Sequence, residues 1–298
     1  MPISTTNPAT GETIETYAEM SAGEIQEIIE KTAEAQRAWS QTTFAERSER
    51  LRTLASILRE DQQRLATLIS QEMGKPIAQA RAEVEKCALG CDFYADHAEA
   101  FLAPEVVETD ASRSFVAYRP LGVVLAIMPW NFPFWQVLRF AAPALMAGNG
   151  ALLKHASNVT GCALAIEELF SRAGYPGNLF RTLRIRSDAV ESVLDHPYVM
   201  AATLTGSTEA GQAVAAAAGM RVKKTVLELG GSDPYVILED ADLDATVTAC
   251  ATGRLQNTGQ SCIAAKRFIV HADVADEFER LFADALRALV VGDPNDDA

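Results

Sequence analysis

The residues best suited to covalent chemistry lie in the stretch Asn257-Thr-Gly-Gln-Ser-Cys262. Its cysteine follows a predicted helix and is surrounded by amide and hydroxyl side chains. A thiolate adds readily to a carbonyl carbon, although a lone thiol in an Ala-rich segment is more often an inert packing residue. Cys262 is therefore a candidate nucleophile whose assignment depends on other parts of the chain.

Three upstream stretches supply groups that complement such a nucleophile. They are Pro129-Trp-Asn-Phe-Pro133, Leu204-Thr-Gly-Ser-Thr-Glu-Ala-Gly211 and Leu227-Glu-Leu-Gly-Gly231. Together with the Cys262 stretch they resemble the aldehyde dehydrogenase superfamily, in that family's order and with similar intervals. The resemblance covers the whole chain, and within the family it is strongest to the succinate-semialdehyde dehydrogenases that accept NAD or NADP.

The resemblance implies three catalytic residues. Cys262 would add to the aldehyde, Asn131 would donate to the resulting oxyanion, and Glu228 would activate the water that hydrolyses the thioester. Asn131 can instead be the N-cap of a helix that begins at Pro133. Glu228 can instead be a solvated or salt-bridged residue, but its leucine neighbours make an idle charge there costly. Because members that transfer the acyl group to coenzyme A typically lack this glutamate, we expect hydrolysis.

The resemblance also implies a dinucleotide cofactor, held without a G-x-G-x-x-G motif. Gly206-Ser207 opens a predicted helix, where backbone N–H groups and the helix dipole favour a pyrophosphate. Ser157 stands where many members carry a ribose-binding glutamate, and a serine can donate to a 2′-phosphate that a glutamate would repel. We therefore expect NADP to be tolerated or preferred over NAD. The residues assigned to the cofactor are Trp130, Lys154, His155, Ala156, Ser157, Gly206, Ser207 and Leu229.

Arg139 is the candidate for substrate recognition. It interrupts an otherwise apolar predicted helix, and a buried guanidinium needs an anion. It matches an arginine assigned to the substrate carboxylate in the semialdehyde enzymes, and a structural salt bridge is an equally weighted alternative. Gln256 stands where a second such arginine is often found. Succinate semialdehyde is the best single candidate; the alternatives are another aliphatic aldehyde or a cofactor-binding fragment without catalysis.

Composition narrows the class of protein further. The chain has 298 residues, 48% of them hydrophobic, and a formal net charge of −14, which is typical of a soluble globular protein without nucleic-acid or membrane partners. The N-terminus does not resemble a signal peptide, and five cysteines without a C-x-x-C pair fit a reducing compartment, so a cytoplasmic protein is expected. We expect Cys87 and Cys91 to pack within a helix, and we predict no metal site.

The first hundred residues predict mainly helices. Capping boxes at Ser21–Glu24 and Thr43–Glu46 begin two of them, a third ends at Gly74, and a long amphipathic helix covers 77–101. The charged face of the long helix, which is interpreted as solvated, comprises Arg81, Glu83, Glu85 and Lys86.

From Leu121 onward, short apolar runs alternate with helical segments, which predicts βαβ units and a parallel sheet. The fold class is therefore α/β: a parallel-sheet dinucleotide-binding domain over 1–227 and the start of an α/β catalytic domain over 228–298. An arm strand near 114–119 is implied by the family resemblance to bridge subunits, so a homo-oligomer is expected for the full-length protein. Since family members are longer, the chain is interpreted as an N-terminal portion that lacks most of the catalytic domain.

Overall fold

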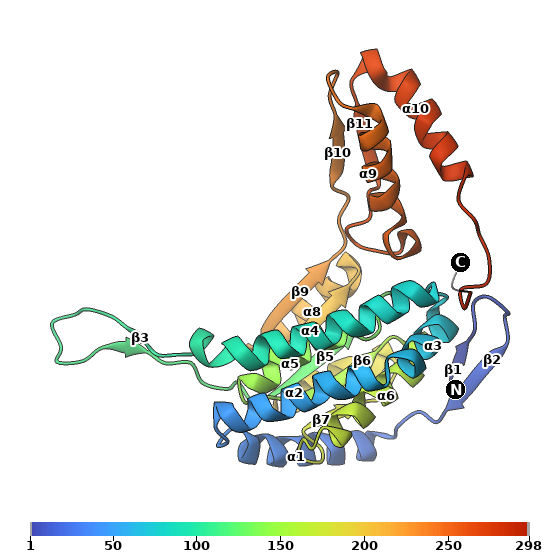
Figure 1. Cartoon of the computed structure of the whole chain (residues 1–298). Helices are drawn as coiled ribbons and strands as arrows, with labels where there is room; N and C mark the ends of the chain where they lie inside the picture. Colours follow the sequence, from blue (N-terminus) through green and yellow to red (C-terminus); the bar gives the residue numbers. More distant parts are fainter. Residues whose placement is uncertain (1, 297–298) are drawn as a thin grey trace.

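A five-stranded parallel sheet forms the centre of the computed structural model, which describes residues 2–296 (Figure 1). Its strand order is β7-β6-β5-β8-β9, and every neighbouring pair is parallel. The strands are β5 (Val123–Met128), β6 (Gly150–His155), β7 (Phe180–Thr182), β8 (Val199–Gly206) and β9 (Lys224–Leu229). The predicted α/β class is confirmed, and the carboxyl ends of all five strands lie along one edge.

Helices cover both faces of this sheet, because alternate residues of a strand point to opposite sides. Leu125 of β5 belongs to a core shared with α1 (Ala22–Trp39), α7 (Val190–Asp195) and α8 (Thr208–Gly219). Its neighbour Ala126 belongs to a larger core on the other side. The helices of that second layer are α2 (Phe44–Glu60), α3 (Gln62–Met73), α4 (Ile77–Phe101), α5 (Trp135–Met146) and α6 (Thr160–Arg172).

Local sequence signals set several helix ends. Both predicted capping boxes are confirmed. The side chains of Ser21 and Thr43 each accept from a backbone N–H three residues on, and the glutamate at that position accepts from the backbone N–H of Ser21 or Thr43. Gly74 ends α3 in a left-handed conformation with φ of 71°, which glycine adopts at no steric cost. The pair Cys87 and Cys91 is buried in α4, as predicted.

Two short hairpins lie outside the main sheet. β1 (Ile3–Thr6) pairs with β2 (Thr13–Tyr17), and β3 (Glu105–Val106) pairs with β4 (Phe115–Val116). The β3–β4 arm projects away from the helices and the central sheet (Figure 1). The strand expected over 114–119 is thus reduced to two residues, and β1 and β7 were not predicted.

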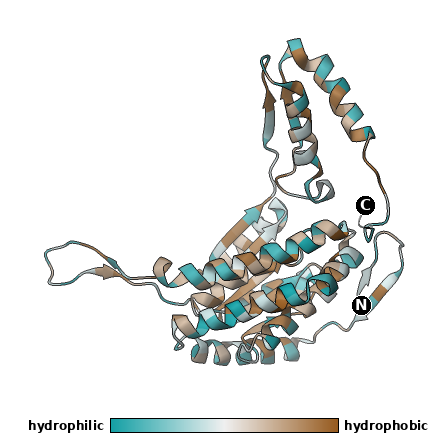
Figure 2. Ribbon diagram, in the orientation of Figure 1, coloured by the Kyte–Doolittle hydropathy of each residue, from teal (hydrophilic) through white to brown (hydrophobic). Residues whose placement is uncertain are grey.

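A smaller βαβ unit follows β9. β10 (Pro234–Ile237) pairs in parallel with β11 (Arg267–Val270), and α9 (Leu243–Leu255) connects them. α10 (Ala272–Arg287) shows alternating hydrophobic and hydrophilic bands (Figure 2), and Phe278 from its apolar face lies in the core of this unit.

The domain boundary proposed from the sequence falls within β9. The central sheet extends through Leu229, two residues past the boundary proposed after residue 227. After α10 the chain runs back to the start of α4, where Pro294 O accepts from the backbone N–H of Ile77 at 2.7 Å (Figure 1). Within residues 2–296, no helix is long and apolar enough to cross a membrane.

Candidate active site

A cavity of about 410 Å³ lies where β5, β8 and β9 end and the loop after α9 approaches them. Ligands of open parallel sheets bind at this edge, outside the carboxyl ends of the strands. Of the residues assigned from sequence, the cavity brings together Trp130, Asn131, Arg139, Gly206, Ser207, Glu228, Leu229 and Cys262. The cavity thus combines groups from all four motifs of the sequence with Arg139 of α5.

The loop that carries Cys262 has an unusual backbone. Asn257 and Thr258 both have φ of 55°, and Gly259 has φ of 76°. Three consecutive left-handed residues turn the chain sharply, although this conformation is unfavourable for asparagine and more so for threonine. Buried Asn257 stabilises the turn, because its Nδ2 donates to Asn131 O at 2.7 Å and to Gln260 O at 3.3 Å. Beyond this turn the thiol of Cys262 is exposed.

Asn131 lies against the same loop. Its Nδ2 donates to the backbone O of Gln260 at 2.7 Å, two residues before Cys262. An amide nitrogen carries two protons, and the only bond from Nδ2 within the described residues uses one of them, so a second donor remains for a ligand. The N-cap alternative was wrong, as was the helix start at Pro133. α5 begins at Trp135 without a side-chain cap, since its first free N–H groups are bound by a carboxylate from another helix.

Glu228 and Arg139 form an ion pair, with Oε2 of the glutamate 3.4 Å from NH2 of the arginine. Their side chains are 56% and 40% exposed. The structure thus shows the salt-bridged alternatives weighed for both residues, and the expected burial of the Arg139 guanidinium was wrong. β9 is an edge strand on which every second residue is exposed, and Glu228 is one of these. Both residues also line an adjoining, mainly apolar cavity of about 780 Å³, which places the ion pair in the wall between the two cavities.

Gly206 and Ser207 join β8 to α8. Ser207 is the N-cap, and its Oγ accepts from Ala210 N at 3.2 Å. The other N–H groups of the first turn remain available to an anion. Lys154, the penultimate residue of β6, is partly buried, and this burial lowers the pKa of its ammonium group. Within residues 2–296 Lys154 has no ion-pair partner, so a cation is available near this edge of the sheet.

His155 and Ser157 follow Lys154 but differ in exposure. The ring of His155 is buried: Nε2–H donates to Pro133 O at 2.9 Å, and Nδ1 accepts from Ala156 N at 3.0 Å. Burial lowers its pKa to about 4. Because both ring nitrogens are engaged by the backbone, only backbone atoms of His155 are free to contact a cofactor. Ser157 is exposed at the start of a 3-10 turn (Ser157–Val159).

Together these donors fit a dinucleotide phosphate. The amides at the start of α8, the Lys154 ammonium and the Ser157 hydroxyl are all hydrogen-bond donors. The helix N-terminus and the ammonium also favour a negatively charged ligand. Of these groups, the start of α8 lines the 410 Å³ cavity, through Gly206 and Ser207, and Lys154 and Ser157 do not.

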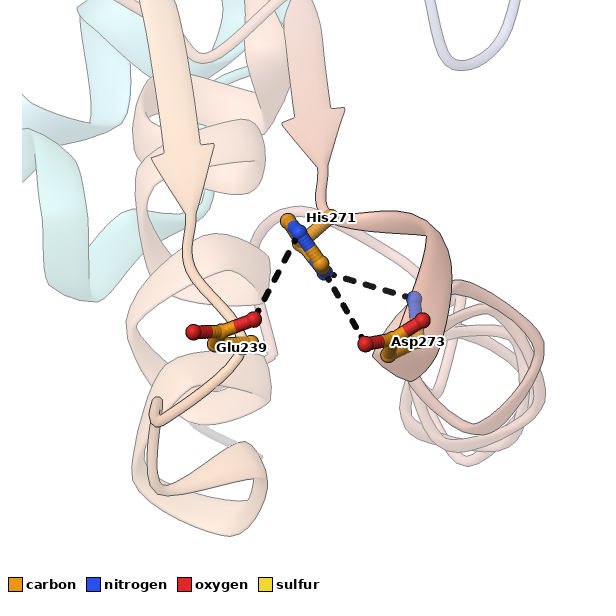
Figure 3. A group of neighbouring side chains, drawn as sticks. All are labelled: Glu239, His271 and Asp273. Carbon is orange, nitrogen blue, oxygen red and sulfur yellow. Dashed lines mark hydrogen bonds and ion pairs between the residues drawn. The ribbon is translucent and has the colours of Figure 1, made fainter.

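Glu239, His271 and Asp273 are the residues whose geometry comes nearest to a metal site in the part of the chain that the structure describes (Figure 3). His271 lies between the carboxylates, 3.6 Å from Glu239 through Nε2 and 3.8 Å from Asp273 through Nδ1. The two carboxylates therefore face different nitrogens, and Nδ1 also accepts from Asp273 N at the start of α10. All three residues are exposed and none lines the 410 Å³ cavity, so we assign no metal role to them.

Sequence reasoning missed a buried ion pair behind this site. Glu83 and Lys75 are 4% and 1% exposed and form a salt bridge, so the interpretation of Glu83 as part of a solvated face was wrong. Its position three residues after Ala80 and four before Cys87 places it on the buried stripe of α4, which was the signal that could have identified it. Gln136, which lines both cavities, was also missed.

Comparison with known proteins places this arrangement in a family. A model of the aldehyde dehydrogenase family matches residues 1–298, and the chain belongs to that family. Over 295 residues it is 55% identical to a probable succinate-semialdehyde dehydrogenase (NADP+) from Synechocystis sp., a match that covers 99% of this chain and 65% of that protein. It is 52% identical over 299 residues to succinate-semialdehyde dehydrogenase (NADP+) 1 from Mycobacterium bovis, with the same two coverages.

Solved structures agree with these matches. The crystal structure of succinic semialdehyde dehydrogenase from Streptococcus pyogenes in complex with NADP+ superposes with a TM-score of 0.96 at 36% identity. That match covers 99% of this chain and 65% of the other. The chain therefore spans about 65% of the length of the relatives it matches.

Proposed function

We propose that this chain is the part of an NADP-dependent succinate-semialdehyde dehydrogenase that binds the cofactor and carries the nucleophile. The single observation that carries the proposal is the 410 Å³ cavity, in which a thiol, an amide, a carboxylate and a guanidinium meet the N-terminus of α8. The names of the most similar relatives support the aldehyde, and their NADP+ designation supports the cofactor.

In this proposal Cys262 acts first. Its thiolate adds to the aldehyde carbon, and the new oxyanion accepts from the Asn131 amide and from the backbone N–H of Cys262. NADP, when bound, supplies the hydride acceptor. The thioester left on Cys262 is then attacked by a water that Glu228 deprotonates, which releases the carboxylate product and restores the thiol.

Arg139 links substrate choice to this last step. In the structure its guanidinium is paired with Glu228, and so exposed a pair contributes little stability. A substrate carboxylate that binds Arg139 would compete with Glu228 for it. The general base would then be freed by an acidic aldehyde and held by Arg139 in its absence.

We further propose that NADP is preferred over NAD and that the full-length protein is a homo-oligomer. Ser157 and Lys154 offer donors, and no glutamate follows the lysine to repel a 2′-phosphate. The β3–β4 arm carries unburied apolar side chains, among them Val106, which is 81% exposed, and this supports a role for the arm in subunit contact.

The test is turnover by the purified chain with succinate semialdehyde and NADP, followed at the reduced-nicotinamide absorbance band. We expect Cys262→Ala to abolish turnover while NADP binding, measured by calorimetry, persists. Cys250→Ala, which removes a buried thiol from the same unit, is the matched control and should keep turnover. Turnover that survives in Cys262→Ala would refute the nucleophile. Binding without turnover in the wild type would favour the alternative, a cofactor-binding portion without catalysis of its own.

A further inference from the structure

The carboxylate of Glu83 connects α4 to the loop that carries Asn131. Its Oε1 accepts from the backbone N–H of Phe134 at 2.9 Å and from that of Trp135 at 3.0 Å. Its Oε2 is bound by the ammonium of Lys75. A buried carboxylate is tolerated only with such partners, and here every partner except Lys75 belongs to the backbone that follows Asn131.

Glu83 therefore does for α5 what a local cap does for other helices. α5 has Phe134 at its N-cap and no side-chain cap of its own, so its first N–H groups would otherwise be unsatisfied inside the protein. A carboxylate at a helix N-terminus also interacts favourably with the helix dipole. The start of α5 is thus determined by a residue about 50 positions earlier in the chain.

Lys75 acts on the same loop from a second direction. Its Nζ lies 4.1 Å from the ring centroid of Phe132, the residue after Asn131, which is a cation–π contact. On the far side of the loop, Asn257 Nδ2 donates to Asn131 O and His155 Nε2 donates to Pro133 O. The backbone from Asn131 to Trp135 is thus held by buried groups.

We propose that Glu83, with its charge balanced by Lys75, is a positioning residue that holds the amide of Asn131 against the Cys262 loop. This inference rests on the proposed function for the role of Asn131. The expected effect on the structure is independent of the proposed function. Loss of the Glu83 carboxylate should loosen the segment 129–135 and its contact with Gln260, whether or not the chain oxidises an aldehyde.

A second buried glutamate that caps a distant helix provides a matched control. Glu72, which is also buried, accepts from Gly161 N and Cys162 N, both at 2.8 Å, at the start of α6. It too is a carboxylate, here from α3, that satisfies two N–H groups of a helix following a strand of the sheet. None of its hydrogen bonds reaches the Asn131 loop.

The experiment compares Glu83→Gln with Glu72→Gln in the whole chain. Amide hydrogen exchange should accelerate by about tenfold or more within 129–135 in Glu83→Gln only. The kcat for succinate semialdehyde should fall about tenfold to a hundredfold, because misplacing or removing one oxyanion donor has effects of this order, while KM for NADP stays within about twofold. Glu72→Gln also removes a buried carboxylate that binds two backbone N–H groups and should keep kcat.

Because Glu83→Gln leaves Lys75 as an unpaired buried cation, the double variant Lys75→Met/Glu83→Gln provides a second test. It removes both charges and should fold, yet show the same local exchange and the same loss of kcat. Wild-type protection of 129–135 in the double variant, or a kcat within twofold of wild type, would overturn the proposal. If the wild type shows no turnover, the proposed function fails, and the exchange measurement still decides the position of the loop.

Discussion

The buried ring of His155 gives the protein a stability that depends on pH. In the folded chain its Nε2–H donates to Pro133 O, and its Nδ1 accepts from Ala156 N and lies 3.2 Å from Met128 O. Burial of the ring favours the neutral imidazole and outweighs the two carbonyl contacts, which favour the charged form. Burial lowers the pKa from the ordinary 6.5 to about 4. A lowered pKa means that the stabilisation is fully present above 6.5 and is lost as the pH falls through 6.5 toward about 4.

The magnitude follows from linkage. Each unit between the two pKa values is worth about 1.4 kcal/mol, so the folded state loses about 1.4 kcal/mol between neutral pH and about pH 5.5 through His155 alone. Other groups also have shifted pKa values, including His196, whose pKa is lowered by burial, and Glu72, whose pKa burial raises. Their effects are common to wild type and variant, so the difference between the two isolates His155.

The assay is urea unfolding followed by circular dichroism at about pH 7.5 and about pH 5.5 for wild type and His155→Gln. We expect the variant to be less stable at the higher pH, because glutamine does not reproduce both hydrogen bonds of the histidine ring. On acidification it should lose about 1.4 kcal/mol less than wild type. His97→Gln removes an exposed ring on α4 and should keep the wild-type difference. An equal loss in wild type and His155→Gln would refute the reasoning.

Three further predictions concern the cofactor, the substrate and the core. Ser157→Glu should lower kcat/KM for NADP by about tenfold or more through repulsion of the 2′-phosphate, with equal or higher kcat/KM for NAD; a parallel loss with both cofactors would contradict it. Arg139→Ala should raise KM about tenfold for succinate semialdehyde and leave KM for a neutral aldehyde of similar length within about twofold, and an equal rise for both would remove Arg139 from substrate recognition. Trp39→Phe should cost about 1–2 kcal/mol in urea unfolding, because the buried indole donates to Leu145 O at 2.8 Å; an unchanged free energy of unfolding would show that this bond contributes nothing.

Features encoded over short distances in sequence were predicted well. The capping boxes at Ser21 and Thr43 and the glycine stop at Gly74 involve residues at most a few positions apart, and the structure has each of them. The apolar runs of β5 and β6 also predicted buried parallel strands, since both faces of such strands are covered. By contrast, β7 has only three residues, too few for a periodic signal.

Charged residues near the site were predicted less well, because their environment depends on distant parts of the chain. Glu83 was interpreted as solvated and is buried by the loop that it holds. Arg139 was expected to be buried and instead forms an exposed pair with Glu228, whose salt-bridged alternative named no partner. The exposure of each of these side chains depends on a partner from another element, and a local sequence pattern does not include that partner.

The family of this chain, its alternating strands and helices, and the residue types available for chemistry could all be identified from the sequence, because motifs and periodicity are local properties. Which of those residues meet depends on tertiary contacts. It takes the parallel edge of the sheet to bring Gly206 and Glu228 to one cavity, and three left-handed residues starting at Asn257 to bring Cys262 there with them. The placement of Asn131 depends on Glu83 and Gln260, which are far from it in sequence, because buried backbone groups are satisfied by whichever partner the fold brings near.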